Sequence, residues 1–389
     1  MFSRRTGWKL TPNRFTEAQR ELRAAGREVM DLTASNPTRA GLAYDAQSIL
    51  ESLSRPEAMD YDPQAKGLTS ARQLVAQYYR EQSGGNQIDP ESVVLTTSTS
   101  EGYSYVFRLL CNPGDEILVP KPSYPLFEFL ADLEDVKLVP YPLLYDHGWQ
   151  IDFHSLRLAV SGKTRAVVLV HPNNPTGSYV SSCERELLNS FCGEHGLALV
   201  VDEVFLDYPH NHATRISFTS NRHSLTFTLS GLSKISGLPQ MKLAWVVTTG
   251  AQKMVSEAMG RLEVIADTYL SLSAPVQLAA GVLLEQRKKI QPLLLERVGT
   301  DLAELDRQLA NQKSCERLNV EGGWYAVLRV PVTQSDEDLA IDLLRETSVM
   351  VHPGHFFDFP SDGYLILSLL TPPAEFRKGI EKVLQFLNR

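Results

Sequence analysis

Seven short apolar runs alternate with helical patterns between residues 92 and 249, and this alternation constrains the fold more than any other feature of the chain. The runs are Ser92–Thr97, Glu116–Val119, Val136–Val139, Ala166–Val170, Ala198–Val201, Leu225–Leu229 and Ala244–Thr248. Parallel strands need long crossover connections, which are usually helices. The alternation therefore predicts an α/β fold whose seven-stranded sheet is mostly parallel and covered by helices. Ligands of such sheets bind at the carboxyl ends of the strands, where we expect the chemistry of this chain.

The pattern changes after the seventh run. From Ser273 to Asn311 apolar residues recur at helical spacing, which predicts one long connecting helix. A compact α+β unit follows, with strands at 323–330, 348–352 and 364–368, a helix at 336–346 and a closing helix. We expect a large domain at 46–290 and a small domain at 291–389. An N-terminal segment at 1–45, with an amphipathic helix from about Arg14 to Ala25, is expected to pack on the small domain.

Charge and composition disfavour several classes of function. The chain has 38 Lys and Arg against 46 Asp and Glu, a net charge of -8 that repels a phosphate backbone, and its basic residues form no cluster. No apolar run reaches the roughly 18 residues that cross a bilayer, and the first residues lack the core of a secretion signal. The four cysteines and the pair His210 and His212 show no complete metal-ligand pattern, so we expect free thiols, a surface histidine loop and no metal. These features predict a cytoplasmic protein without nucleic-acid or membrane partners.

Four motifs follow apolar runs in chain order: TTSTSEG at 96–102, HPNNPTG at 171–177, VVDEVF at 200–205 and SGLSKISGLPQMKLAW at 230–245. Because each motif follows a strand, Ser98, Asn174, Asp202 and Lys234 are expected along one edge of the sheet. A lysine, an aspartate after a buried strand, an asparagine and a hydroxyl-rich helix start are the groups that hold a phosphorylated pyridine aldehyde. Each also has an ordinary alternative: a surface lysine, an aspartate that caps a turn, a generic turn and a simple helix cap.

With these motifs the chain resembles the class I/II aminotransferases, fold type I enzymes that use pyridoxal 5'-phosphate (PLP). The resemblance covers nearly the whole chain, and NNPTG together with the later SK and GLP pattern is its most specific part. It implies a homodimer that moves an amino group from an amino acid to a 2-oxo acid. A carbon–sulfur lyase or a decarboxylase on the same scaffold is an alternative, and a PLP-binding module without catalysis is a third hypothesis.

The resemblance also implies roles for individual residues. Lys234 would form the Schiff base and act as general base, Asp202 would hold the pyridine nitrogen protonated, and Asn174 would hydrogen-bond the ring oxygen O3'. The start of the helix at Ser98 and Thr99 would bind the phosphate.

Further cofactor contacts follow from the same comparison. Tyr124 matches the aromatic residue that stacks on the pyridine ring, and Tyr61 resembles the tyrosine that reaches a phosphate across the dimer interface. Lys242 stands where the family usually has an arginine that pairs with the phosphate. Lysine supplies the charge without the two-pronged geometry, so Ser230 and Ser233 are expected to contribute.

The chain departs from the family around the substrate. Ile366 stands where most relatives have an arginine that grips the α-carboxylate, and the best alternative cation is Arg39, for which a surface arginine is the other interpretation. Tyr269 lies near where dicarboxylate-specific relatives carry a second arginine, which favours a neutral or aromatic amino donor. His355, within HPGHF, could line the pocket. Phe205 replaces a tyrosine that normally donates to O3', so one donor is missing.

Overall fold

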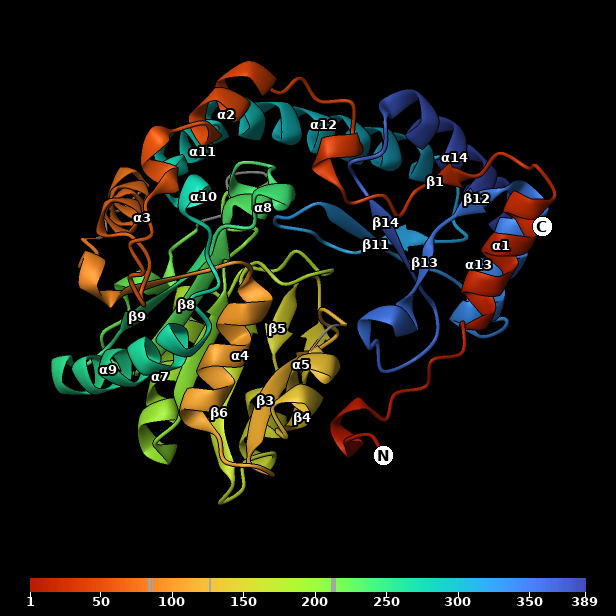
Figure 1. The fold of residues 1–389 in the computed structure, drawn as a ribbon. Coiled ribbons are helices and arrows are strands. Elements are labelled where there is room, and N and C mark those ends of the chain that lie inside the picture. Colours follow the sequence, from red (N-terminus) through yellow and green to blue (C-terminus); the bar gives the residue numbers. More distant parts are fainter. Residues whose placement is uncertain (83–84, 86, 126, 211–214) are drawn as a thin grey trace.

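The computed structural model describes residues 1–389 except 83–84, 86, 126 and 211–214. Within these residues an eight-stranded, mostly parallel sheet lies at the centre of the larger part (Figure 1). In spatial order its strands are β2 (Val93–Thr96), β9 (Ala244–Thr249), β8 (Thr226–Gly231), β7 (Ala198–Asp202), β6 (Thr164–Val170), β3 (Glu116–Lys121), β4 (Lys137–Tyr145) and β5 (Trp149–Ile151). The predicted fold class is confirmed and all seven predicted strands are present. The prediction missed β5, an antiparallel edge strand of three residues, because so short a strand shows no clear alternation.

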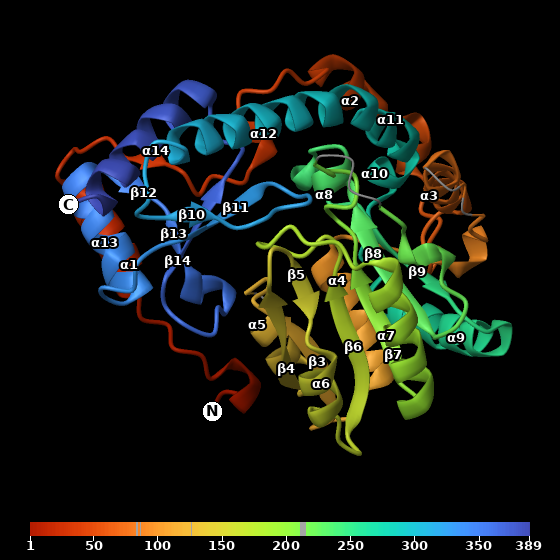
Figure 2. The same cartoon turned by 180° about the vertical axis from the view of Figure 1, so that it is seen from behind.

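Helices cover both faces of this sheet, because successive strand residues point to opposite sides. Ala198 and Val200 of β7 face one core, with α4 (Thr99–Leu110), α5 (Phe127–Leu133) and α9 (Gln252–Tyr269). Leu199 and Val201 face the other, with α6 (Phe153–Leu158) and α7 (Ser182–His195). Figure 1 shows the α4 side of the sheet and Figure 2 the α7 side. Near β2 and β9 lie α2 (Ala46–Leu53), α3 (Thr69–Glu81) and α11 (Ala280–Glu285), and the short α8 (Leu232–Ile235) follows β8.

The smaller part of the molecule contains an antiparallel sheet in the order β10 (Glu316–Arg317), β11 (Tyr325–Arg329), β14 (Tyr364–Ser368) and β13 (His352–Pro353). It shares a core with α13 (Asp336–Thr347) and α14 (Pro373–Leu387). β1 (Met30–Asp31) pairs in parallel with β12 (Val349–Met350), so this stretch of the N-terminal segment lies in the smaller part.

The connecting region differs from the predicted single helix. It consists of α10 (Ala274–Leu278), α11 and α12 (Arg287–Leu309). The ψ angle of Ala279 is -6°, far from the helical value, and this interrupts the helix between α10 and α11. No helix in the described part of the chain is long and apolar enough to span a membrane.

The N-terminal residues contact both parts of the molecule. Helix α1 (Arg14–Ala24) packs against α13. The preceding residues cross to α5, where the Trp8 indole donates to Asp132 Oδ2 at 2.7 Å and its ring lies 5.4 Å from that of Phe129. Figure 1 shows the N-terminus beside α5. The sequence predicted the contact with the small sheet and its helices but not this second attachment.

Candidate active site

Four strand ends place polar groups at one edge of the large sheet. β7 ends at Asp202, Lys234 lies in α8 directly after β8, Asn174 follows β6, and α4 begins directly after β2. The charges of Asp202 and Lys234 interact, because each shifts the pKa of the other toward its ionised form. The structure therefore brings together the lysine and the aspartate that the sequence singled out.

Lys234 is held beside aromatic rings. Its Nζ lies 4.8 Å from the ring centre of Trp324 and 5.2 Å from that of Phe205. The Tyr208 hydroxyl donates to the Lys234 backbone carbonyl at 2.6 Å, which fixes the short helix. Burial lowers the pKa of Lys234 to about 8, and the charge of Asp202 opposes this shift. The amine therefore has a sizeable neutral, nucleophilic fraction near physiological pH.

Asp202 is buried, with 8% of its surface exposed. Its Oδ1 accepts from the Val204 backbone N–H at 3.0 Å, and its Oδ2 accepts from the Tyr103 hydroxyl at 3.2 Å. Burial raises the pKa of Asp202 to about 6, while these two hydrogen bonds and Lys234 act in the opposite direction. The carboxylate is thus held in one orientation with a charge that a protonated ring nitrogen could pair with.

The two asparagines of the NNPTG loop differ in their partners. Asn173 donates to the Pro122 carbonyl at 3.1 Å and to Thr176 Oγ1 at 2.9 Å, and it accepts from Ser123 at 3.2 Å. Asn174 is 8% exposed, and its buried Oδ1 lacks a partner among the described residues. Buried polar atoms are nearly always satisfied, so this end of the amide fits a ligand that the chain itself does not supply. Asn173 instead has a structural role.

The start of α4 presents backbone amides to the site. Ser98 is the N-cap, and its Oγ accepts from the Glu101 N–H at 3.2 Å. The Glu101 carboxylate reaches back to the Thr97 N–H at 2.6 Å. The predicted simple cap is therefore present, and the first-turn amides of Thr99 and Ser100 remain for an anion. A phosphate fits this helix start.

The other predicted phosphate contacts lie in different environments. The buried Ser230 hydroxyl donates to the Glu203 carbonyl at 3.4 Å, so it already has a weak backbone partner. Ser233 is half-buried in α8 next to Lys234. Lys242 is exposed and has a left-handed backbone, with φ of 51°. No described side chain forms an ion pair or hydrogen bond with Lys242.

Aromatic side chains surround the site. Tyr124 is 36% exposed between β3 and α5, and burial, with a smaller contribution from the nearby Asp202, raises the pKa of its hydroxyl to about 12. Its ring lies 6.2 Å from that of Phe127, edge to face. Phe205 is buried and packs edge to face on Trp324 at 5.2 Å. Tyr124 and Phe205 therefore both lie within the site.

The wall opposite the large sheet is apolar and comes from the smaller part of the molecule. Trp324 and Tyr325 lie against Phe205 and were not singled out from the sequence. Gly177 explains how this segment approaches. Its φ is 71°, and a Cβ there would lie 2.4 Å from the Gly322 carbonyl oxygen, so only glycine allows the contact. The sequence signal that could have identified these two aromatic residues is the Gly-Gly-Trp-Tyr segment at 322–325, in which two glycines precede the start of β11.

Ile366 lies within this apolar wall. It is 0% exposed and pairs across the sheet with Val327 and His352.

Arg39, the predicted substitute for the family's carboxylate-binding arginine, is exposed at the end of a short 3-10 turn (Pro37–Arg39), and its guanidinium has no described partner. Pro37 lies near Gly237, three residues after Lys234, so this turn is close to the site. His355 is exposed and packs on Phe356 at 4.7 Å, and no described contact joins it to Lys234.

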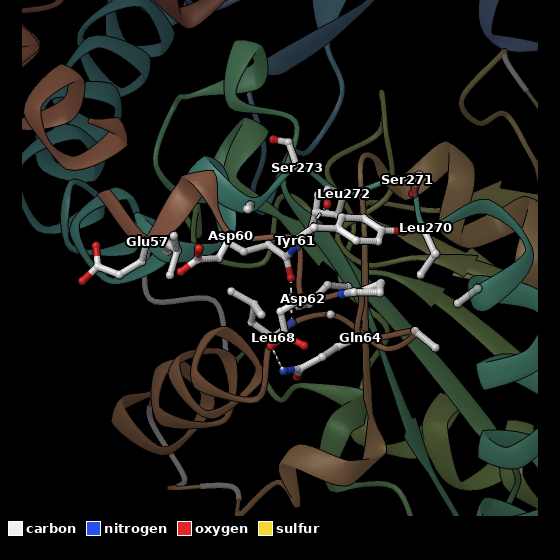
Figure 3. A pocket seen from close by; sticks show the side chains of 18 of the residues that line it. Glu57, Asp60, Tyr61, Asp62, Gln64, Leu68, Leu270, Ser271, Leu272 and Ser273 are labelled. Atoms are coloured by element: carbon white, nitrogen blue, oxygen red, sulfur yellow. Dashed lines mark hydrogen bonds between the residues drawn. The ribbon is translucent and has the colours of Figure 1, made fainter. Parts of the chain in front are cut away.

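No described contact joins Tyr61 or Tyr269 to Lys234. Tyr61 is 83% exposed and lines a cavity of about 500 Å³ between the 57–68 and 270–278 segments (Figure 3). Tyr269 is half exposed, stacks on Tyr105 at 5.8 Å and lies 5.0 Å from the Arg108 guanidinium. Arg108 is itself paired with Glu134 at 2.6 Å. The cation nearest Tyr269 is therefore already neutralised.

The predicted histidine loop needs a correction. His210 is 8% exposed and its backbone N–H donates to the Glu321 carbonyl at 2.7 Å, so it is buried and not on the surface. It packs against the segment that carries Trp324, a contact that local sequence does not reveal. His212 lies outside the described residues. Among the residues that are described, no group of three potential ligands could hold a metal ion.

Comparison with known proteins agrees with this geometry. The sequence profile of aminotransferase class I and II matches residues 27–383. The chain belongs to this family. It is 30% identical over 380 residues to alanine aminotransferase of Mycobacterium tuberculosis, which covers 94% of this chain and 87% of that protein. It is 26% identical over 398 residues to glutamate-pyruvate aminotransferase of Escherichia coli, which covers 96% and 93%. The structure of alanine aminotransferase from Pyrococcus furiosus has a TM-score of 0.89 at 23% identity and covers 100% of both chains. This aminotransferase therefore transfers amino groups between amino acids and 2-oxo acids.

Proposed function

We propose that this aminotransferase binds PLP at the edge of the large sheet and uses a neutral or aromatic amino acid as amino donor. The observation that carries the proposal is the position of Lys234, in the short helix after β8, near the buried Asp202 at the end of the neighbouring strand β7. The unpartnered Asn174 amide and the free amides at the start of α4 add the remaining polar contacts. The family in general depends on PLP, and these groups fit its aldehyde, ring nitrogen, ring oxygen and phosphate.

The chain's own residues would divide the work as follows. Bound PLP supplies an electron sink for the charge that develops at the substrate Cα. Lys234 holds the cofactor through Nζ and, when released, carries a proton to and from the substrate carbon. Asp202 keeps a negative charge opposite the ring nitrogen, and Asn174 orients the ring oxygen. Trp324, whose ring lies beside Nζ, would exclude water from the amine.

The substrate preference rests on the apolar wall. Burying a charge without a partner is costly, and the position of Ile366 offers no cation for a side-chain carboxylate or an α-carboxylate. We assign the α-carboxylate contact to Arg39, because its turn lies beside the loop after Lys234 and its guanidinium is unpaired among the described residues. The relative named alanine aminotransferase agrees with a neutral donor, whereas the one named glutamate-pyruvate aminotransferase is named for an acidic amino acid, so acidic donors belong in the test panel.

We also propose a homodimer in the cytoplasm. Met59 and Tyr61 are 88% and 83% exposed beside a cavity that Lys234 does not line, which suits a surface that a second copy covers. All four cysteines are unpaired, as in a reducing compartment. Light scattering at the assay concentration should give twice 43.4 kDa, and an active monomer would contradict the dimer.

A donor half-reaction tests the proposed function. Purified protein with PLP should convert stoichiometrically to the pyridoxamine form when given amino donor alone, and a 2-oxo acid should restore the starting absorbance. A lyase would instead release pyruvate or ammonia without an acceptor, and a decarboxylase would release carbon dioxide. Absence of any spectral change across a panel of neutral, aromatic and acidic amino acids would indicate a non-catalytic module.

A further inference from the structure

Tyr103 lies 99 residues before Asp202 in the chain, yet its hydroxyl reaches the carboxylate at 3.2 Å. The contact exists because α4 packs closely on the sheet. A Cβ on Gly102 would lie 3.0 Å from side-chain carbons of both Leu229 in β8 and Val246 in β9. Glycine at this position therefore lets α4 pack closely against the sheet. As a result the next residue, Tyr103, lies within hydrogen-bond distance of Asp202, the last residue of β7.

Tyr103 is buried among aromatic rings, so Asp202 is the described hydrogen-bond partner within reach of its hydroxyl. The residue is 2% exposed. Its ring packs edge to face on Phe127 at 5.3 Å and tilted on Phe107 at 5.8 Å. Among the described residues Asp202 is its hydrogen-bond partner, and burial raises the pKa of Tyr103 well above its usual value. Tyr103 therefore stays protonated and acts as a donor throughout the working pH range.

Asp202 has few other groups that stabilise its charge. The Val204 N–H donates to Oδ1, and the Tyr103 hydroxyl donates to Oδ2. A donor to a carboxylate favours its ionised form, so losing one of two such donors makes a buried carboxylate more basic. A more basic carboxylate would draw the shared proton away from a ring nitrogen opposite it.

We propose that Tyr103 is a positioning residue that keeps Asp202 ionised and oriented toward the ring nitrogen of the cofactor. The inference rests on the proposed function, since it presupposes that Asp202 faces that nitrogen. The same aromatic cluster continues through Phe127 to Tyr124, so the helix that carries Tyr103 also supports the residue expected to stack on the ring. Tyr103 acts through Asp202 and does not itself contact the substrate.

Tyr103→Phe in the full-length holoenzyme tests this role, because it removes one oxygen and keeps the packed ring. We expect kcat to fall roughly 10- to 100-fold with KM little changed, the range for losing a hydrogen bond to a charged group. The decisive readout is the 15N shift of the ring nitrogen in 15N-labelled PLP, which should move toward the unprotonated value. The dissociation constant of PLP should rise as well.

Tyr141→Phe is the matched control. Tyr141 is equally buried, at 1% exposure, but donates to the Val168 carbonyl at 2.8 Å and has no contact with Asp202. Its loss should lower thermal stability without moving the 15N shift. In an Asp202→Asn background, Tyr103→Phe should cause little further loss, since the two residues act as one unit. If Tyr103→Phe does not fold, a fluorotyrosine at position 103, a stronger donor, should raise the pH at which the 15N signal leaves its protonated value, and an unchanged pH would overturn the role of Tyr103.

The outcomes separate the two proposals. A protonated ring nitrogen in the parent enzyme and an unchanged 15N shift in Tyr103→Phe would overturn the role of Tyr103 alone. Full additivity with Asp202→Asn would do the same. Failure of the parent enzyme to bind PLP at all would overturn the proposed function and this inference together.

Discussion

The two walls of the candidate site are built in opposite ways. The large sheet contributes charged and polar groups, each placed directly after a strand, and its lysine and aspartate have strongly shifted pKa values. The smaller part contributes Trp324, Tyr325 and Ile366, all nearly or fully buried and without charge. Under the proposed function, the polar wall would carry the chemistry, and the apolar wall would select the substrate and exclude water.

The largest expected effect comes from removing the amine of the polar wall. Lys234→Ala should lower kcat by roughly 10³-fold or more, because it removes both the covalent anchor and the proton carrier. The fold should persist, as judged by circular dichroism. Lys253→Ala, on the exposed face of α9, is the control and should leave kcat unchanged. A Lys234→Ala enzyme near the parent rate would remove the lysine from the mechanism.

Arg39→Ala tests whether Arg39 binds the substrate's α-carboxylate, for which the apolar wall has no cation. We expect KM to rise roughly 10- to 100-fold for amino acids, since a charge-assisted contact to the α-carboxylate is lost. Simple amines without a carboxylate should be almost unaffected. Arg27→Ala, another exposed arginine, serves as the control. Equal effects on both kinds of substrate would place the carboxylate contact elsewhere.

The pH dependence of Lys234 should reveal how the two charges of the polar wall are coupled. With a pKa of about 8, against an ordinary 10.5, capture of a small aromatic aldehyde by the apoprotein should rise with pH and level off above about 8. Below that point the amine is protonated and unreactive. Asp202→Asn removes the charge that raises this pKa, so the midpoint should move lower. Absorbance measurements across pH give the midpoint of aldehyde capture in the parent protein and in Asp202→Asn. A higher midpoint in Asp202→Asn would contradict the coupling.

The smallest expected effect concerns Phe205, which lies where the polar and apolar walls meet. Phe205→Tyr adds a hydroxyl beside Lys234, and a donor to the ring oxygen should lower the apparent pKa of the cofactor's visible absorbance by about one unit or less. Phe357→Tyr, also buried but farther along the apolar wall, should cause no shift. An unchanged or raised value in Phe205→Tyr would show that its ring points away from the ring oxygen.

Much of the polar wall could be predicted because its signals are local. An apolar run followed at once by Asp202 or Lys234 predicts both the strand and the position of the side chain, since parallel strands end at a common edge. The helix start at Ser98 is equally local, because a cap involves residues three apart. The sequence did not reveal that Asn173 has structural partners while the Asn174 Oδ1 has none among the described residues. This difference depends on contacts of Asn173 with Pro122 and Ser123, about fifty residues away.

Seven strands of the large sheet, the polar residues that follow four of them, and the absence of an arginine at position 366 could be predicted from the sequence alone. Periodicity, turn residues and motifs lie within short windows, so they survive without knowledge of the fold. Three contacts emerge only from the folded chain: the Tyr103 hydroxyl donates to Asp202, Trp324 lies beside Lys234, and Trp8 reaches α5. These contacts join residues that lie some 90 to 125 positions apart, and they depend on how closely helices and loops pack, as at Gly102 and Gly177. Packing at such separations is a property of the whole fold, which no local pattern encodes.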